Sequence, residues 1–297
     1  MSSPVLEVVD LQVELVTPAG VVRAVDGVSF TVGRGETVTL IGESGSGKST
    51  TAMALLRLLP DDLAVISGHA LLNGVDVVSD RRGVNRLRGR TVALIPQDPM
   101  TALNPIRTIG RQMVEAIRIR RPELSRADAA RRAVSLLEQV HILDPERRLR
   151  AYPHELSGGM LQRVLIAMAI SAEAELLVAD EPTSALDVTV QAGILDLLLE
   201  LQETTGVAMM LITHDLGVAR LMSDRIHVMR AGRFVESADA EELVQHPQDP
   251  YTQQLLAAVP DLGQWDDPAL AHPELAAAAA AAALAATHPE LIPEASR

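Results

Sequence analysis

GESGSGKST, residues 42–50, is the stretch that decides the fold of this chain. It fits the pattern G-x-x-x-x-G-K-[ST] directly after an apolar run at 38–41 and before a helical pattern at 50–59, the context that this pattern requires. A strand, a glycine-rich turn and a helix N-terminus together aim backbone N–H groups and the positive end of a helix dipole at one point. The sequence therefore predicts a phosphate-binding loop, here called the phosphate loop, made of Gly42, Glu43, Ser44, Gly45, Ser46, Gly47, Lys48, Ser49 and Thr50.

Lys48 is the only lysine among the 26 basic residues of the chain. Arginine serves everywhere else, whereas this position needs a compact ammonium group, because a planar guanidinium would not fit the same pocket. We expect Lys48 to reach the β and γ phosphates of a nucleotide and the Ser49 hydroxyl to hold Mg²⁺. The alternative is a glycine-rich turn that matches by chance, and the flanking strand and helix disfavour it.

The composition sets outer bounds on the function. A chain of 297 residues with 47% hydrophobic residues predicts a globular protein of two domains, or of one domain with an insertion. No apolar run approaches the ~18 residues of a membrane span, and the first residues lack the features of a signal peptide, so we expect a soluble, cytoplasmic chain. The absence of cysteine excludes disulfides and cysteine-held iron–sulfur clusters. A net charge of −13 argues against nucleic-acid binding.

Strands and helices are expected to alternate along most of the chain. A small antiparallel sheet is expected from strands at 5–15, 21–24 and 28–32, and further strands are expected at 64–66 and 69–72 with the turn Asn73-Gly74. Residues 81–90 are expected to be a polar connection before a strand at 91–95. Further strands are expected at 176–179, 207–212, 225–229 and 233–235, and helices at 160–171, 188–204, 215–222 and from 241 onward. This alternation predicts an α/β fold with a mostly parallel sheet covered on both faces.

Two segments differ from this alternation. Residues 107–150 carry 11 arginines and six acidic residues in helical patterns, which predicts an inserted helical subdomain at about 99–170. Its basic surface is either a solvated helix face or a docking surface for anionic lipid head groups or acidic loops of a membrane partner. The chain from residue 261 to 297 is alanine-rich, and we expect a marginal helix in a flexible tail.

Acidic and polar residues follow three of the expected strands. Asp180 and Glu181 end the apolar run at 176–179, where Asp180 would support Mg²⁺ directly or through water and Glu181 would polarise the attacking water. On its own, this pair of acids is also compatible with a helix N-cap with a turn at Pro182. Gln97 would offer an oxygen to Mg²⁺ and the attacking water, and His214 would donate to the γ phosphate. Taken singly, each of these two is also compatible with an ordinary loop residue.

A second glycine-rich helix start lies at Ser157, Gly158 and Gly159. A serine and two glycines that open a helix form a further anion site. One nucleotide cannot occupy both anion sites if they lie far apart in one subunit. The chain is therefore expected to pair with a second one.

With these motifs the sequence resembles the ATP-binding subunit of an ABC transporter, from about residue 6 to residue 260. The family signature LSGGQ is LSGGM here, at 156–160. The other motifs follow in the family order: phosphate loop, Q-loop at Gln97, Walker B at 176–181, D-loop ending at Asp187, and switch His214. The resemblance implies a P-loop NTPase with a RecA-like core, an antiparallel β subdomain and a helical subdomain that receives membrane subunits. It further implies two subunits that close head to tail on two ATP molecules, with Ser157, Gly158, Gly159 and Asp187 contacting ATP.

Two stretches resemble the peptide and nickel importer branch of that family: QDPMTALNP at 97–105, and HPQDPY at 246–251 with Leu255-Leu256. This implies ATP-driven import of a small solute, with di- and oligopeptides as the leading class. The implied partners are transmembrane permease subunits, a second homologous ATPase subunit and, indirectly, an extracytoplasmic solute-binding protein, at the cytoplasmic face of the membrane. In the family an aromatic side chain stacks on adenine at the position where this chain has Leu15. Many members of the branch also hold an iron–sulfur cluster through cysteines, and this chain has no cysteine, so that cofactor is excluded.

Two other classes of function stay open at this stage. A soluble ABC-type ATPase that acts on ribosomes or nucleic acid usually carries a second cassette or a long coiled-coil insertion, and the sequence has neither. A plain phosphotransferase needs an acceptor site and no signature, so LSGGM argues against it. The transported solute is not readable from this chain, because other subunits of such importers select it.

Overall fold

The structure, a computed structural model, describes residues 3–184 and 186–257 of the chain. A six-stranded sheet forms its centre, with the strand order β10-β9-β3-β8-β7-β6. The neighbouring pairs are parallel except for β9 and β10, which are antiparallel. The strands are β3 (Thr37–Ile41), β6 (Val92–Ile95), β7 (Leu176–Asp180), β8 (Ala208–Thr213), β9 (Arg225–Arg230) and β10 (Arg233–Asp239). Every residue of β3, β7 and β8 is buried, as expected for parallel strands that are covered on both faces.

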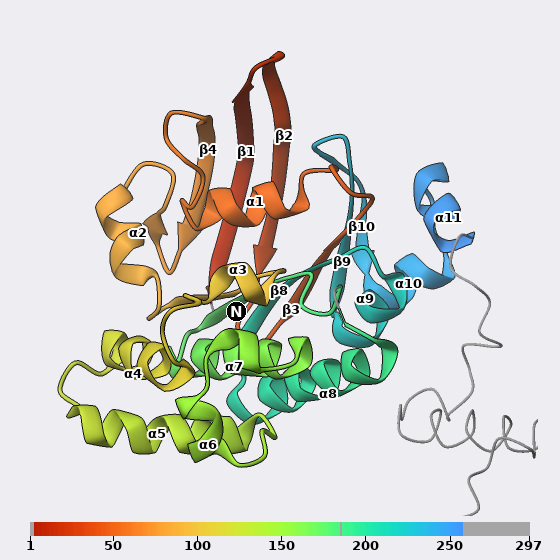
Figure 1. The fold of residues 1–297 in the computed structure, drawn as a ribbon. Helices are drawn as coiled ribbons and strands as arrows, with labels where there is room; N and C mark the ends of the chain where they lie inside the picture. Colours follow the sequence, from red (N-terminus) through yellow and green to blue (C-terminus); the bar gives the residue numbers. More distant parts are fainter. Residues whose placement is uncertain (1–2, 185, 258–297) are drawn as a thin grey trace, which may run out of the picture. The chain divides into compact units, whose positions relative to one another are not determined.

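Side chains of β7 alternate between the two faces of the central sheet, because successive side chains of a strand point to opposite sides. Leu176 and Val178 pack in one hydrophobic cluster with residues of α1, β1 and β2, whereas Leu177 and Ala179 pack in the other with residues of α4, α5, α7 and α8. Figure 1 shows helices α4, α5, α7 and α8 below the central strands. The helices are α1 (Lys48–Leu55), α4 (Ile109–Arg120), α5 (Arg126–Gln139), α7 (Gly158–Ser171), α8 (Val188–Thr205) and α9 (Leu216–Met222). The expected α/β class is confirmed.

The expected antiparallel sheet is present, with the order β2-β1-β4-β5. Its strands are β1 (Leu6–Thr17), β2 (Gly20–Val32), β4 (Ala64–Leu72) and β5 (Val75–Asp76). The sequence predicted two strands each in place of β2 and β4, and both predictions were wrong. In β4, Gly68 has a φ of 88°, and a Cβ there would overlap the Asp10 carbonyl group. The register with β1 shifts at this point, so an irregularity bends one strand without ending it.

The prediction of a polar connection at 81–90 was also wrong, because helix α2 (Arg81–Leu87) lies there. The Asp80 carboxylate caps this helix by accepting a hydrogen bond of 2.8 Å from the Gly83 N–H. Val84 is buried and Leu87 packs partly against the same hydrophobic cluster, and these two apolar residues were too few to show as a helical period in the sequence. Other elements that the sequence did not reveal are α3 (Pro99–Ala102), α6 (Pro145–Arg150), the 3₁₀ turn at Pro153–Glu155 and α11 (Pro250–Ala257).

Helices α4 and α5 start at side-chain caps in the arginine-rich segment. The hydroxyl groups of Thr108 and Ser125 accept hydrogen bonds from the backbone N–H groups of Arg111 and Asp128. Within residues 3–184 and 186–257, no helix is both long and apolar enough to cross a membrane. The compact unit ends at Leu256, after α10 (Ala240–Gln245) and most of α11. The alanine-rich tail that was expected to be flexible lies outside the described residues.

His227 of β9 is a buried histidine in the sheet. Its side chain is 4% exposed, its Nδ1 lies 2.7 Å from the Ser237 hydroxyl, and its ring stacks on Phe234 with centroids 4.7 Å apart. Burial, and then the positive charge of Arg225, lower the pKa of His227 to about 4. The imidazole is therefore neutral in the folded protein at a pH at which it is protonated in the unfolded chain.

We predict that His227 makes stability fall in mild acid. Its pKa is about 4 in the folded state and 6.5 in the unfolded state. Between these values the unfolded chain binds the extra proton, so the free energy of unfolding decreases by roughly 3 kcal/mol as the pH falls from above 6.5 to 4. Urea unfolding of the unmutated protein and of His227→Gln over this pH range measures the contribution. In the variant, the free energy of unfolding should depend less on pH between 4 and 6.5. An equal pH dependence in both proteins would contradict the lowered pKa of His227.

Candidate functional site

The predicted catalytic residues meet at one edge of the central sheet. Gln97 follows β6, Glu181 follows β7 and His214 follows β8. Parallel strands end at the same edge, where ligands bind in open α/β sheets. A cleft of about 1020 Å³ opens there. It is lined by Leu15, Val22, Arg23, Ala24, Gly42, Glu43, Ser44, Gly45, Gly47, Lys48, Ser49, Thr50, Gln97, Glu181, His214, Ala231, Gly232 and Leu255.

Glycines let the phosphate loop lie against neighbouring backbone. Gly42 and Gly47 have φ values of 150° and 111°, and a Cβ on them would overlap the carbonyl oxygens of Met229 and Ala24, respectively. Gly45 has a φ of 81° but open space beside it. Side chains are therefore excluded at Gly42 and Gly47 by two independent constraints, the dihedral angle and the contact, and at Gly45 by the dihedral angle alone.

Lys48 places a buried positive charge in this loop. Its Nζ donates hydrogen bonds of 2.8 Å and 2.9 Å to the carbonyl oxygens of Gly42 and Glu43, and the residue is 4% exposed. Burial lowers the pKa of Lys48, while the nearby carboxylates of Glu181 and Asp180 oppose that shift. An ammonium group has three N–H donors, so one remains for an anion in the cleft.

Ser49 and Asp180 present oxygen atoms beside the loop. The Ser49 hydroxyl donates a hydrogen bond of 2.8 Å to Asp180, which is 2% exposed. Burial raises the pKa of Asp180, while the bond from Ser49 acts in the opposite direction. Hydroxyl, carboxylate and amide oxygens are the ligands that Mg²⁺ takes, with water and phosphate completing its shell. Among the described residues no group of three or more His, Cys, Asp and Glu side chains is arranged to hold a metal.

Ser46 is the one residue of the phosphate loop whose side chain is not among those that line the cleft. Its hydroxyl oxygen is buried and has no hydrogen-bond partner in the part of the chain that the structure describes. Buried polar groups normally have partners, because an unpaired one costs about 1–3 kcal/mol. This unpaired hydroxyl group does not face the cleft, so it is a local cost of the loop conformation.

Glu181 is held between the two other predicted catalytic side chains. Gln97 Nε2 donates a hydrogen bond of 2.9 Å to Glu181 Oε2, and His214 Nδ1 lies 3.3 Å from the same oxygen. The backbone of Glu181 has a φ of 44°, and its N–H donates to the Ile212 carbonyl group. The chain thus turns sharply after β7 and directs this carboxylate into the cleft. A carboxylate fixed there can orient a water molecule for attack on a phosphate.

The signature residues lie away from this cleft. Ser157 caps α7, Asp187 caps α8 by accepting from the Val190 N–H at 3.0 Å, and neither lines the cleft. A Cβ on Gly159 would overlap the side chain of Val190, so this glycine allows α7 and α8 to pack closely. The structure therefore brings together the phosphate loop, Gln97, Glu181 and His214, but not Ser157, Gly158, Gly159 or Asp187.

Sequence reasoning missed two contributions to the site from α11. Leu255 lines the cleft, and the hydroxyl oxygen of Tyr251 accepts a hydrogen bond of 3.1 Å from the Glu43 N–H. Both residues stand in a stretch that sequence analysis singled out, but only as a mark of the importer branch. Because Tyr251 and Glu43 are 208 positions apart, no local pattern links them.

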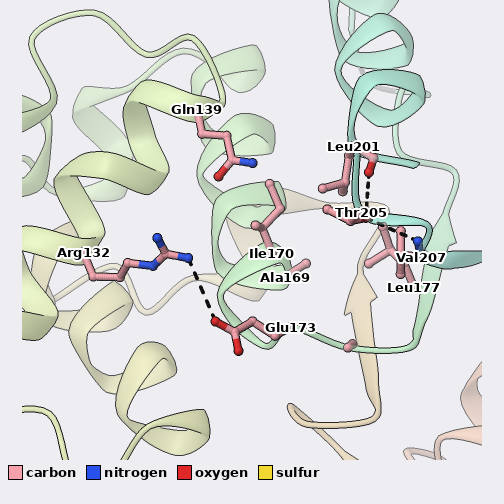
Figure 2. Close-up of a pocket in the computed structure, with 10 residues that line it drawn as sticks. Arg132, Gln139, Ala169, Ile170, Glu173, Leu177, Leu201, Thr205 and Val207 are labelled. Atoms are coloured by element: carbon pink, nitrogen blue, oxygen red, sulfur yellow. Dashed lines mark hydrogen bonds and ion pairs between the residues drawn. The ribbon is translucent and has the colours of Figure 1, made fainter. Parts of the chain in front are cut away.

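A second cavity of about 330 Å³ lies on another part of the core, between α5, α7 and α8 (Figure 2). The Arg132 guanidinium and the Glu173 carboxylate lie 4.0 Å apart on one side of it, and Leu177 and Leu201 form an apolar wall on the other. None of the predicted site residues lines this cavity. We assign the chemistry to the cleft at the phosphate loop.

Comparison with known protein families gives two matches. Residues 25–184 match the family described as ABC transporter, and residues 235–283 match the family described as oligopeptide/dipeptide transporter, C-terminal region. A probable peptide ABC transporter ATP-binding protein of Sinorhizobium fredii is 48% identical over 86% of this chain and 77% of its own length. A dipeptide transport ATP-binding protein of Bacillus subtilis is 47% identical over 87% of this chain and 77% of its own. For an oligopeptide transport ATP-binding protein of Mycobacterium bovis, 49% identical, the match spans 42% of that protein.

Solved structures resemble the chain as well. The dimeric post-hydrolysis state of an ATP-binding cassette bound to ADP and Pi has a TM-score of 0.70 at 26% identity, over 79% of this chain and 98% of that one. The ATP-binding subunit of an ABC transporter has a TM-score of 0.64 at 30% identity, over 81% of this chain and 92% of that one. The expected cassette fold is thereby confirmed.

We predict that two alanine substitutions in the phosphate loop will differ in their cost. Gly42→Ala must displace the Met229 carbonyl group and also adopt an unfavourable φ, whereas Gly45→Ala carries the conformational cost alone, about 1–2 kcal/mol. Thermal unfolding without any ligand should therefore show a clearly larger drop in melting temperature for Gly42→Ala. Equal drops in the two variants would mean that the contact with Met229 places no constraint on the loop.

Proposed function

The chain belongs to the ABC transporter family as an ATP-binding protein, and we propose that it is the ATPase subunit of an importer for di- or oligopeptides. The proposal of ATP hydrolysis rests on the position of Glu181, which Gln97 and His214 hold in the cleft that the phosphate loop lines. The importer part is supported by the match of residues 235–283 and by the names of the similar proteins.

ATP is proposed to bind with its phosphates in the phosphate loop. The free donor of Lys48 and the backbone N–H groups of the loop suit the β and γ phosphates. Ser49, Asp180 and Gln97 would hold Mg²⁺, with Asp180 acting directly or through water. The ion would neutralise charge on the phosphate oxygens.

Hydrolysis is proposed to use Glu181 to orient the attacking water. The amide of Gln97 and the imidazole of His214 lie on one of its oxygens, so they fix the direction of the carboxylate. His214 is 59% exposed on its side chain, which leaves it free to turn from Glu181 toward the γ phosphate. Gln97 is likewise exposed, and it can exchange its contact with Glu181 for one to Mg²⁺.

The second half of each ATP site is proposed to come from another cassette. Ser157, Gly158, Gly159 and Asp187 lie outside the cleft of their own chain, and Ser157 and Gly158 are exposed. A second, homologous ATPase subunit that faces the cleft head to tail would supply these residues. The remaining proposed partners are transmembrane permease subunits and, through them, an extracytoplasmic solute-binding protein, with the chain at the cytoplasmic face of the membrane and no nucleic acid bound.

The other classes of function receive less support. The similar proteins are named as transport ATP-binding proteins, and this favours the importer over an ATPase that acts on ribosomes or nucleic acid. The fold and the exposed signature disfavour a plain phosphotransferase. The identity of the transported peptide is a property of the other subunits.

We predict that Glu181→Gln will bind MgATP with nearly unchanged affinity but lose a factor of roughly 10² or more in turnover, because it removes the group that orients water and leaves the phosphate contacts. Calorimetry and a phosphate-release assay measure the two quantities. The matched control is Glu203→Gln, the same chemical change at an exposed position of α8. If Glu181→Gln keeps more than about a tenth of the rate, another group positions the water.

A further inference from the structure

The C-terminal helix α11 contacts the phosphate loop directly. Tyr251 is 4% exposed, and its hydroxyl oxygen accepts the hydrogen bond from the N–H of Glu43, the residue that follows Gly42. The N–H of Glu43 therefore points to a side chain from outside the motif, and this contact anchors the first half of the phosphate loop to α11.

The ring of Tyr251 is itself held in place. The guanidinium of Arg230 lies over it, 4.7 Å from the ring centroid. The segment before α11 is fixed to β10, because the Glu236 carboxylate accepts hydrogen bonds of 2.8 Å and 3.0 Å from the N–H groups of Gln248 and Asp249. The hydroxyl group of Tyr251 is therefore delivered from a rigid support.

The turn after β9 holds the phosphate loop from a second direction. The N–H of Gly232 donates to the Ser46 carbonyl group at 2.9 Å, and the Gly232 carbonyl group accepts from Asp26 at 2.8 Å. Arg230, which stacks on Tyr251, stands directly before this turn, two residues from Gly232. One continuous set of contacts thus joins α11, the end of β9 and both halves of the phosphate loop.

Leu255, one turn further along α11, lines the nucleotide cleft. Three large apolar side chains line this cleft, and they come from three different elements: Leu15 of β1, Val22 of β2 and Leu255 of α11. The base is the part of a nucleotide with apolar faces. An apolar wall in a cleft that otherwise offers N–H groups and carboxylates is suited to it.

We propose that α11 forms one wall of the nucleotide site, in which Tyr251 holds the phosphate loop in its binding conformation and Leu255 contacts the base. The inference rests on the proposed function, since it takes a nucleoside triphosphate as the ligand. Tyr251 is a positioning residue, and Leu255 is a binding residue. The segment that matches the oligopeptide/dipeptide transporter C-terminal region begins before α11, so a branch-specific region reaches the ATP site.

The first test is Tyr251→Phe in the full chain. This variant removes only the hydroxyl group and keeps the ring under Arg230. A loop that must order itself on binding loses affinity, so the dissociation constants of MgATP and of inorganic triphosphate should both rise about three- to tenfold by calorimetry. The KM for ATP should rise by the same factor while kcat stays within twofold.

The matched control is Thr252→Val. It removes a buried hydroxyl group from the next residue of α11, and this group contacts the Glu236 carboxylate, not the phosphate loop. Its nucleotide affinity should stay within twofold of the unmutated protein. An equal loss in both variants would show that Tyr251 only packs α11, and unchanged affinity in Tyr251→Phe would refute its role.

The second test separates the base from the phosphates. Leu255→Ala should weaken MgATP and MgGTP about tenfold and leave inorganic triphosphate unchanged, whereas Tyr251→Phe weakens all three. Leu256→Ala, the adjacent leucine that does not line the cleft, is the control. Unchanged ATP affinity in Leu255→Ala would refute the contact with the base. If the unmutated chain bound no MgATP at all, the proposed function itself would fail. If the unmutated chain bound MgATP and the variants bound it equally well, only the role of α11 would be refuted.

Discussion

The buried ammonium group of Lys48 is the interaction on which the site depends. A charge in the core costs several kcal/mol unless it is paired, and here two backbone carbonyl groups and two nearby carboxylates surround it. The carbonyl groups are those of Gly42 and Glu43, so the ammonium also closes the loop on itself. The one donor that remains makes this position a receptor for an anion.

The central sheet explains why these groups meet. The Walker B strand β7 and the strand β3 before the loop are separated only by β8, and all three are fully buried. Asp180 therefore reaches Ser49, and Glu181 reaches the cleft, without any long side chain having to span a gap. The helix starts at Ser157 and Asp187 belong to the other packing layer, which places them outside the cleft of their own chain.

The sequence was most informative where function follows from the end of a parallel strand. Gln97, Glu181 and His214 could be placed together before the structure, because three buried strands that run in one direction must end at one edge. The continuity of β4 through Gly68 was not predictable in this way, since it depends on a bulge in the pairing with β1. Helix α2 was not predicted for a different reason: its residues are mostly polar, and only Val84 and Leu87 pack against the hydrophobic core.

The contacts of α11 with the site could not be predicted from the sequence for a more general reason. The contact between Tyr251 and Glu43 joins residues that are 208 positions apart, and only the fold brings them together. The same limit applies to Gly159, whose place in the signature motif suggests a ligand while the structure also shows a packing contact with Val190. One glycine can serve both purposes, because the backbone N–H groups of a helix start remain exposed while the Cα side packs.

We expect a second cassette to complete the cleft, and site-directed cross-linking can detect it, since the chain contains no cysteine. Ser44→Cys and Ser157→Cys, each made in the Glu181→Gln background, are mixed and oxidised with and without MgATP. The two different variants should form a mixed disulfide only with MgATP. A mixed disulfide that forms equally without nucleotide, or a nucleotide-dependent dimer in which the two introduced thiols never join, would contradict this expectation.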